Sequence, residues 1–231
     1  MELLKKVQES IIREHYKSAV AQYPQLRKPY QDEGVWSIYG RIDIVDLEGN
    51  NWDTYEVKIV FPLNYPQDLP ILFEVGGKIK RDKEWHINVS GSCCLGPPVK
   101  LLIDLAGRIT LVDWLDKHAV PFLANHFLKD KTDHYAGEEY SHGHKGILEF
   151  YQQWWNQEDA QEILLKLGKI TKKIKIGRNK PCFCESGKNY KECHLFSKDY
   201  LGVPIKFFEE DYASIRALTN LKNGSRLNNH I

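Results

Sequence analysis

Residues 36–61, WSIYGRIDIVDLEGNNWDTYEVKIVF, decide the fold class of this chain. Glu48–Asn51 supplies the Gly and Asn residues that are typical of a tight turn. On both sides of this turn, mostly apolar residues occupy every second position, which is the period of a half-buried strand. These positions are Trp36, Ile38, Gly40, Ile42 and Ile44 before the turn, and Tyr55, Val57, Ile59 and Phe61 after it. The stretch predicts two antiparallel strands, and the short apolar run Ile71–Val75 adds a third strand to the meander.

Helical patterns flank this meander on both sides. Residues 1–22 carry apolar positions at the spacing of one helical face. Thr110, followed three residues later by Asp113, resembles a capping box that opens the run LVDWLDKHAVPFLANHFL, and Pro121 is expected to kink or divide that helix. Residues 143–169 predict one or two further helices, ending near Gly168. Segregated strands and helices indicate an α+β fold.

Composition excludes several classes of protein. The chain has 231 residues, 42% hydrophobic and 27% charged, with a formal net charge of +1, so it can bury a core and is neither disordered nor a general coat for nucleic acid. Charges run through the first 20 residues without an apolar core, so we expect no signal peptide, no membrane partner and a cytoplasmic location. In a chain of this kind, cysteine clusters indicate metal binding or catalysis rather than disulfides.

The C-terminal cysteine cluster has the spacing of a metal site. Residues 177–194, GRNKPCFCESGKNYKECH, contain a C-x-C-x8-C-H pattern with Gly187 in the connecting loop, where a sharp turn is needed. Two pairs of soft or borderline ligands brought together by such a turn suit the tetrahedral geometry of structural zinc. The candidate ligands of this Zn²⁺ ion are Cys182, Cys184, Cys193 and His194.

This segment closely resembles the SEC-C motif, the zinc-binding tail of the preprotein translocase ATPase that recurs on many bacterial proteins. The resemblance implies a zinc module with a docking role. It implies no catalysis, because four protein ligands leave no open position on the metal.

The centre of the chain resembles a second family, the ubiquitin-conjugating (ubiquitin carrier) enzymes. The helix and meander are followed by FPLNYPQDLP (61–70), which looks like the family's F-P-x-x-Y-P-x-x-x-P connection. His86-Ile87-Asn88 then resembles the His-Pro-Asn tripeptide, Gly91–Leu95 resembles the G-x-x-C-L active-site segment, and Thr110–Leu115 lies where that family begins its next helix. The resemblance covers residues 1–156 and implies the family's α+β fold, with an N-terminal helix, an antiparallel meander and C-terminal helices.

The family's chemistry implies roles for the loop residues. Cys94, which precedes Leu95, takes the place of the cysteine that carries a protein's C-terminus as a thioester. A thiolate suits this task because it is both a good nucleophile and a good leaving group. Asn88 takes the place of the asparagine that orders the loop and stabilises the oxyanion. His86 completes the candidate catalytic set, with a structural role favoured over that of a general base, and Cys93 is expected to pack inside.

Two departures from the family pattern stand in this loop. Ile87 replaces the proline, and five residues separate Asn88 from Cys94, fewer than in eukaryotic members. Together with the SEC-C tail and the segment Glu139–Gly143, these differences point to bacterial relatives found in anti-phage operons, including cyclic-oligonucleotide signalling (CBASS) operons. There, similar proteins attach the C-terminus of a cGAS-like nucleotidyltransferase to other molecules. The resemblance thus implies a protein partner with a C-terminal carboxylate, such as that nucleotidyltransferase.

The expected organisation has four parts: a catalytic domain over 1–165, a basic linker over 166–176, the zinc motif over 177–196, and a partly helical tail over 197–231. Nine Lys and Arg against two Glu between residues 166 and 194 would suit an acidic partner or RNA, although a solvated linker explains them equally well.

Other functions stay open at this point. They are a non-catalytic binding module of the same fold, an adaptor whose zinc tail binds protein or RNA, and a cysteine hydrolase with a histidine base.

Overall fold

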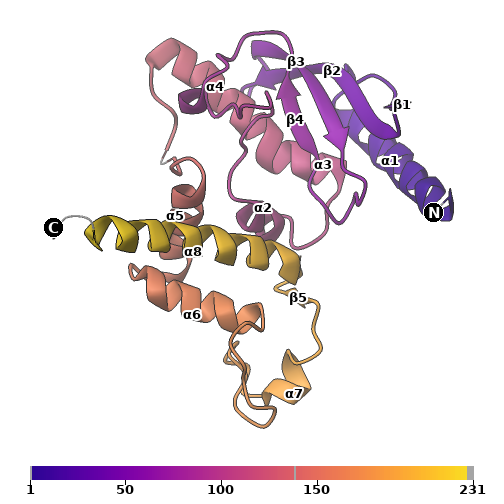
Figure 1. The fold of residues 1–231 in the computed structure, drawn as a ribbon. Coiled ribbons are helices and arrows are strands. Elements are labelled where there is room, and N and C mark those ends of the chain that lie inside the picture. Colours follow the sequence, from indigo (N-terminus) through magenta and orange to yellow (C-terminus); the bar gives the residue numbers. More distant parts are fainter. Residues whose placement is uncertain (1, 138, 228–231) are drawn as a thin grey trace. The chain divides into compact units, whose positions relative to one another are not determined.

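The structure is a computed structural model that describes residues 2–137 and 139–227, with side chains described for 6–137 and 139–220 (Figure 1). It divides into two units. The first unit comprises the residues up to Leu95 together with Arg108–Glu139, and the second comprises Gly96–Gly107 and the residues from Tyr140 onward. Among the described residues, no helix combines the length and apolar character needed to cross a membrane.

A four-stranded antiparallel sheet forms the centre of the first unit, with strand order β1-β2-β3-β4. In Figure 1, helices lie behind this sheet. The elements of the unit are α1 (Glu2–Gln22), β1 (Tyr30–Asp32), β2 (Val35–Val45), β3 (Asn51–Phe61), β4 (Ile71–Glu74), η1 (Lys83–Trp85), α3 (Leu111–Trp114), η2 (Leu115–Ala119) and α4 (Val120–Thr132). The predicted α+β class and antiparallel meander are therefore confirmed, and the short strand β1 is an addition to them.

The register of the sheet explains the alternation in the sequence. Trp36 of β2 pairs with Phe61 of β3, and Ile42 pairs with Tyr55. All four side chains are buried, whereas Arg41 and Glu56, which pair with each other between them, are exposed and joined by a salt bridge of 3.0 Å. A shift of one residue would exchange the buried and solvated faces, so the apolar pattern fixes this pairing.

The predicted helix after Thr110 begins and divides as its sequence indicates. The Thr110 hydroxyl accepts a hydrogen bond from the Asp113 backbone N–H at 3.1 Å and donates one to the Asp113 carboxylate at 2.7 Å. One π-helical turn, η2, stands immediately before α4, whose second residue is Pro121. Proline cannot donate a backbone hydrogen bond, so a change of helical pitch at this point is expected.

The second unit is helical and is built around α8 (Ile205–Leu227), which packs against α5 (His144–Trp155) and α6 (Ala160–Ile170). Phe208 and Ile215 of α8 are fully buried, as is Tyr151 of α5. The remaining elements are α2 (Pro98–Asp104), α7 (Tyr190–Cys193), β5 (Asp199–Tyr200) and β6 (Val203–Pro204). The segment expected as a C-terminal tail therefore supplies core residues, and its last residues, 228–231, lie outside the described part of the chain.

The expected linker also differs from the structure. Lys166–Ile170 belongs to α6, and Leu167 and Ile170 are buried. The lysines of this stretch are the polar face of an amphipathic helix, whose apolar face packs inside the second unit. Any linker therefore begins after α6 rather than at residue 166.

A buried carboxyl group sits in the core of the second unit. The Tyr151 hydroxyl donates a 2.8 Å hydrogen bond to Asp211, which is 3% exposed. Burial raises the pKa of Asp211 to about 7, and the hydrogen bond from Tyr151 only partly offsets this. The folded state therefore binds a proton on Asp211 that the unfolded state releases near its ordinary pKa of 3.8.

Stability of the second unit should consequently fall as pH rises from about 4 to about 7, and remain lower above that range. Asp211→Asn removes the charge, so we expect it to stabilise α5 and α8 at pH 8 by at least about 1 kcal/mol relative to its effect at pH 4. Hydrogen–deuterium exchange of the two helices measures this. Glu209→Gln, a change at an exposed carboxyl group of the same helix, is the matched control, and an equal response of both variants would contradict the prediction.

Candidate active site and metal centre

The cysteine loop of the first unit is a small hairpin. The 3₁₀ turn η1 precedes it, capped by the Asp82 carboxylate, which accepts from the Glu84 backbone N–H at 2.8 Å. Ile87 and Cys93 form an antiparallel bridge. The Cys94 N–H donates to the His86 carbonyl at 2.7 Å, which closes one end of the hairpin.

At the other end, the Asn88 N–H donates to the Ser92 carbonyl at 2.8 Å. Gly91 has a φ of 85°, a backbone conformation that glycine adopts without strain. The sequence therefore forms a tight turn between Asn88 and Ser92, and this turn returns the chain so that Cys94 lies beside His86.

This pairing separates the two cysteines. Side chains alternate across a bridged pair, so Ile87 and Cys93 share one side, and the next residue, Cys94, faces the other. Ile87 and Cys93 are each 7% exposed, whereas Cys94 is only partly buried. Burial raises the pKa of the Cys93 thiol to about 12, so Cys93 stays protonated at neutral pH and is a poor nucleophile. Of the two loop thiols, Cys94 is the more exposed.

Asn88 belongs to the same hairpin as Cys94. Its side-chain amide donates a 3.0 Å hydrogen bond to the Ser92 hydroxyl, which in turn lies 2.9 Å from the Ser90 hydroxyl. These contacts give Asn88 a part in ordering the turn. The oxyanion role stays a prediction.

His86 occupies an unusual position with an acidic neighbour. Its φ of 50° lies in the left-handed region, where non-glycine residues are uncommon. Its Nε2 atom lies 2.8 Å from the Glu139 carboxylate, and its ring packs edge-on against Tyr135 with centroids 5.5 Å apart. Reasoning from the sequence assigned Glu139 no chemical role, because 53 positions separate it from His86 and it lies outside any helix or strand.

A buried histidine of α4 supports the turn before the loop. His126 is 2% exposed, and its two ring nitrogens lie 2.8 Å from the Phe122 carbonyl and 2.9 Å from the Trp85 carbonyl. Burial lowers the pKa of His126, and the hydrogen bonds to the Phe122 and Trp85 carbonyls partly offset this. The Tyr135 hydroxyl lies 3.2 Å from the same ring. One helix thus anchors the residue that immediately precedes His86.

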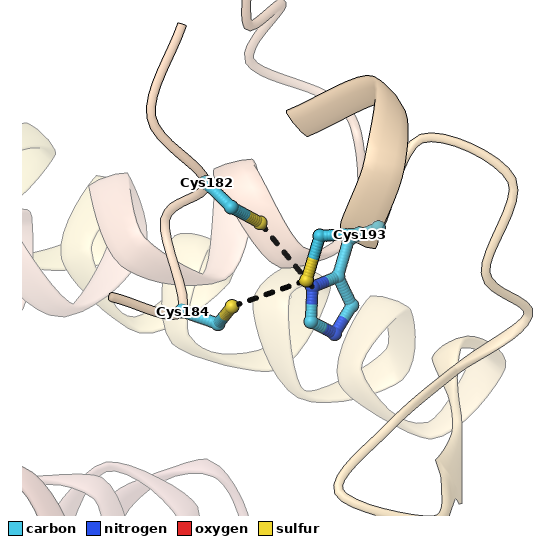
Figure 2. Close-up of side chains that lie close together, drawn as sticks. Cys182, Cys184 and Cys193 are labelled. Atoms are coloured by element: carbon cyan, nitrogen blue, oxygen red, sulfur yellow. Dashed lines mark hydrogen bonds between the residues drawn. The ribbon is translucent and has the colours of Figure 1, made fainter. Parts of the chain in front are cut away.

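The second unit brings the four predicted metal ligands together. Cys182 and Cys184 lie on a turn that Gly187, with a φ of 75°, helps to close. Cys193 ends α7, and His194 is the residue that caps this helix. Figure 2 shows the three cysteine sulfurs turned toward one another. The ligand atoms of the four residues all lie within 4.8 Å of one another.

These distances suit one tetrahedral ion. The Cys184 and Cys193 sulfurs are 3.5 Å apart, and His194 Nδ1 lies 3.3 Å from the Cys182 sulfur and 3.1 Å from the Cys193 sulfur. Zn–S bonds of about 2.3 Å would place two sulfurs about 3.8 Å apart in a tetrahedron, so the cluster would need only a small expansion. Three thiols and an imidazole are a donor set that zinc prefers, and they would hold it as a structural ion.

A comparison with known protein families supports the metal site of the second unit. The SEC-C motif matches residues 178–196, which include all four candidate ligands. The crystal structure of the yeast vps23 UEV domain in complex with a vps27 PSDP peptide overlaps this chain with a TM-score of 0.36 and 16% sequence identity, covering 61% of this chain and 94% of that chain. An overlap of this size carries no functional argument.

The metal cluster predicts one bound ion per chain. Cys184→Ser replaces a thiolate by a poor zinc ligand, so we expect the zinc content of the purified protein to fall from about one equivalent toward zero. Hydrogen exchange around α7 should rise in parallel, because metal binding and folding of such modules are coupled. Elemental analysis measures the metal.

Cys93→Ser, outside the cluster, should keep its zinc and serves as the control. A wild-type protein that contains no zinc, or a Cys184→Ser protein that retains a full equivalent, would contradict the assignment.

Proposed function

We propose that the first unit is a cysteine-dependent acyl transferase of the ubiquitin-conjugating type. Cys94 would carry the C-terminus of a protein as a thioester and pass it to an amine. This proposal rests on the difference in burial between the two adjacent thiols. Cys93 is buried, with its pKa raised to about 12, while Cys94 is partly exposed. The loop motif HIN…GSCCL adds the resemblance to the carrier family.

The transfer takes place in two steps. The Cys94 thiolate attacks an activated carbonyl carbon, a C–S bond forms, and the activating group leaves. In the second step an amine attacks the same carbon, a C–N bond forms, and the C–S bond breaks to release the thiolate. The hairpin supports both steps because its backbone hydrogen bonds hold Cys94 at a fixed place. Asn88 would order the turn and assist the oxyanion.

The acyl donor is proposed to be a protein with a free C-terminal carboxylate. The resemblance to bacterial carrier proteins favours a ubiquitin-like protein or a cGAS-like nucleotidyltransferase, and an antiviral setting such as a CBASS operon. The zinc module would stabilise the second unit and offer a docking site. Its neighbouring lysines would suit an acidic partner or RNA.

A second candidate, a cysteine hydrolase, draws on one specific observation. His86 lies beside Cys94 along the hairpin and contacts Glu139 at 2.8 Å, so a thiol, an imidazole and a carboxylate belong to one loop region. A hydrolase would transfer the acyl group to water, whereas a transferase would favour an amine. A binding module of the same fold would form no acyl intermediate at all.

A chemically activated peptide tests these functions without an activating enzyme. We expect a glycine-ended peptide α-thioester to acylate the wild-type protein and Cys93→Ala, and not Cys94→Ala, because Cys94 is the partly exposed thiol of the loop and zinc would hold the thiols of the second unit. Mass spectrometry of the intact protein, with and without a reducing thiol, measures the adduct. Circular dichroism of both variants controls for folding.

An adduct that persists in Cys94→Ala would contradict the choice of cysteine. The absence of any adduct on the wild type would favour the binding module, and rapid loss to water in the presence of excess amine would favour the hydrolase.

A further inference from the structure

We infer that His86 and Glu139 form the proton-accepting site for the incoming amine, whose chemical class is a primary amine that is cationic at neutral pH, such as a lysine side chain. This inference rests on the proposed function. The structure brings a carboxylate to His86 from a distant part of the chain.

His86 and Cys94 lie next to each other in the hairpin. The Cys94 backbone N–H donates to the His86 carbonyl at 2.7 Å, so the two residues are held side by side across the hairpin. The left-handed backbone at His86, with a φ of 50°, takes its side chain out of the regular strand alternation, and the ring contacts Glu139 and Tyr135. A left-handed backbone in a non-glycine residue is maintained only where the surroundings over-determine it.

The contact with Glu139 determines which nitrogen of the His86 ring carries a proton. Glu139 lies 2.8 Å from Nε2, so the Nε2–H group donates to the carboxylate. In the neutral imidazole this leaves Nδ1 as the proton acceptor. Glu139 would thus be a positioning residue, which sets the tautomer of His86 and stabilises the imidazolium after proton transfer.

The Glu139 carboxylate is accessible to an incoming cation, whereas the His86 ring is more buried. The Glu139 side chain is 42% exposed and the His86 side chain 16% exposed, so a cation can approach the carboxylate while the ring is largely shielded from water. Burial, and secondarily the Glu139 charge, raise the pKa of Tyr135, so this neighbour stays a neutral phenol. The Lys129 ammonium lies over the Tyr135 ring, 4.4 Å from its centroid. The Glu139 carboxylate contacts the His86 ring directly.

The proton transfers of the reaction involve the amine, His86 and Cys94. The ammonium first passes one proton to Nδ1 of His86 and attacks the Cys94 thioester as a neutral amine. The new C–N bond forms and the C–S bond breaks, the second N–H proton passes to the departing Cys94 thiolate, and the imidazolium releases its proton to solvent. The products are an amide and a free thiol, with no oxidant or reductant required.

Acyl discharge separates this role from a structural one. Each protein is loaded with the same glycine-ended peptide thioester, and discharge is followed with N-acetyl-lysine methylamide and, separately, with hydroxylamine. Lysine must lose protons to react, whereas hydroxylamine is already uncharged at neutral pH. We expect His86→Gln to slow lysine discharge by about 10–100-fold and Glu139→Gln by about tenfold, with loading and hydroxylamine discharge changed less than about threefold.

Glu56→Gln makes the same chemical change at an exposed carboxylate on the sheet, where it pairs with Arg41, and should leave every rate unchanged. Normal loading with unchanged lysine discharge in His86→Gln and Glu139→Gln would overturn this inference and leave the proposed function standing. Equal slowing of both nucleophiles would also overturn it, because that is the signature of a loop that has lost its shape. Failure of the wild type to load would overturn the proposed function itself.

Discussion

A backbone hydrogen bond ties the cysteine loop to the sheet. The Cys93 N–H donates to the Leu72 carbonyl of β4 at 2.8 Å. Leu72 and Cys93 are both buried, and a buried backbone donor left unpaired would cost about 1–3 kcal/mol. The bond therefore fixes which cysteine faces the interior, and the alternation of the hairpin then turns the next residue outward. The chemistry proposed for Cys94 follows from the placement of its neighbour.

Much of this arrangement could be predicted from local patterns in the sequence. Alternation over residues 36–61 predicted the paired strands, and the metal-ligand spacing predicted a cluster that the structure brings within 4.8 Å. Thr110 predicted its helix start because a cap involves atoms only three residues apart. Each of these signals depends on neighbours in the sequence, which is why each can be read without a structure.

Other features depend on packing between distant segments, which local sequence patterns do not reveal. Glu139 meets His86 only after α3, η2 and α4 have returned the chain to the loop. The lysines of α6 indicated a linker because they dominate the local composition, although the apolar face with Leu167 and Ile170 is buried. Likewise, α8 looked like a tail and supplies the core of the second unit. In these cases the tertiary partner decides the structure, and composition alone misleads.

The fold gives the neighbouring thiols of Cys93 and Cys94 unequal exposure to solvent. Competitive alkylation of the native protein with iodoacetamide at neutral pH, followed by peptide mass spectrometry of the site, measures this most directly. The account predicts that Cys94 is labelled at least about tenfold faster than Cys93, and that Cys93 reaches a comparable rate only after denaturation. Labelling of both cysteines at similar rates in the folded protein would contradict it.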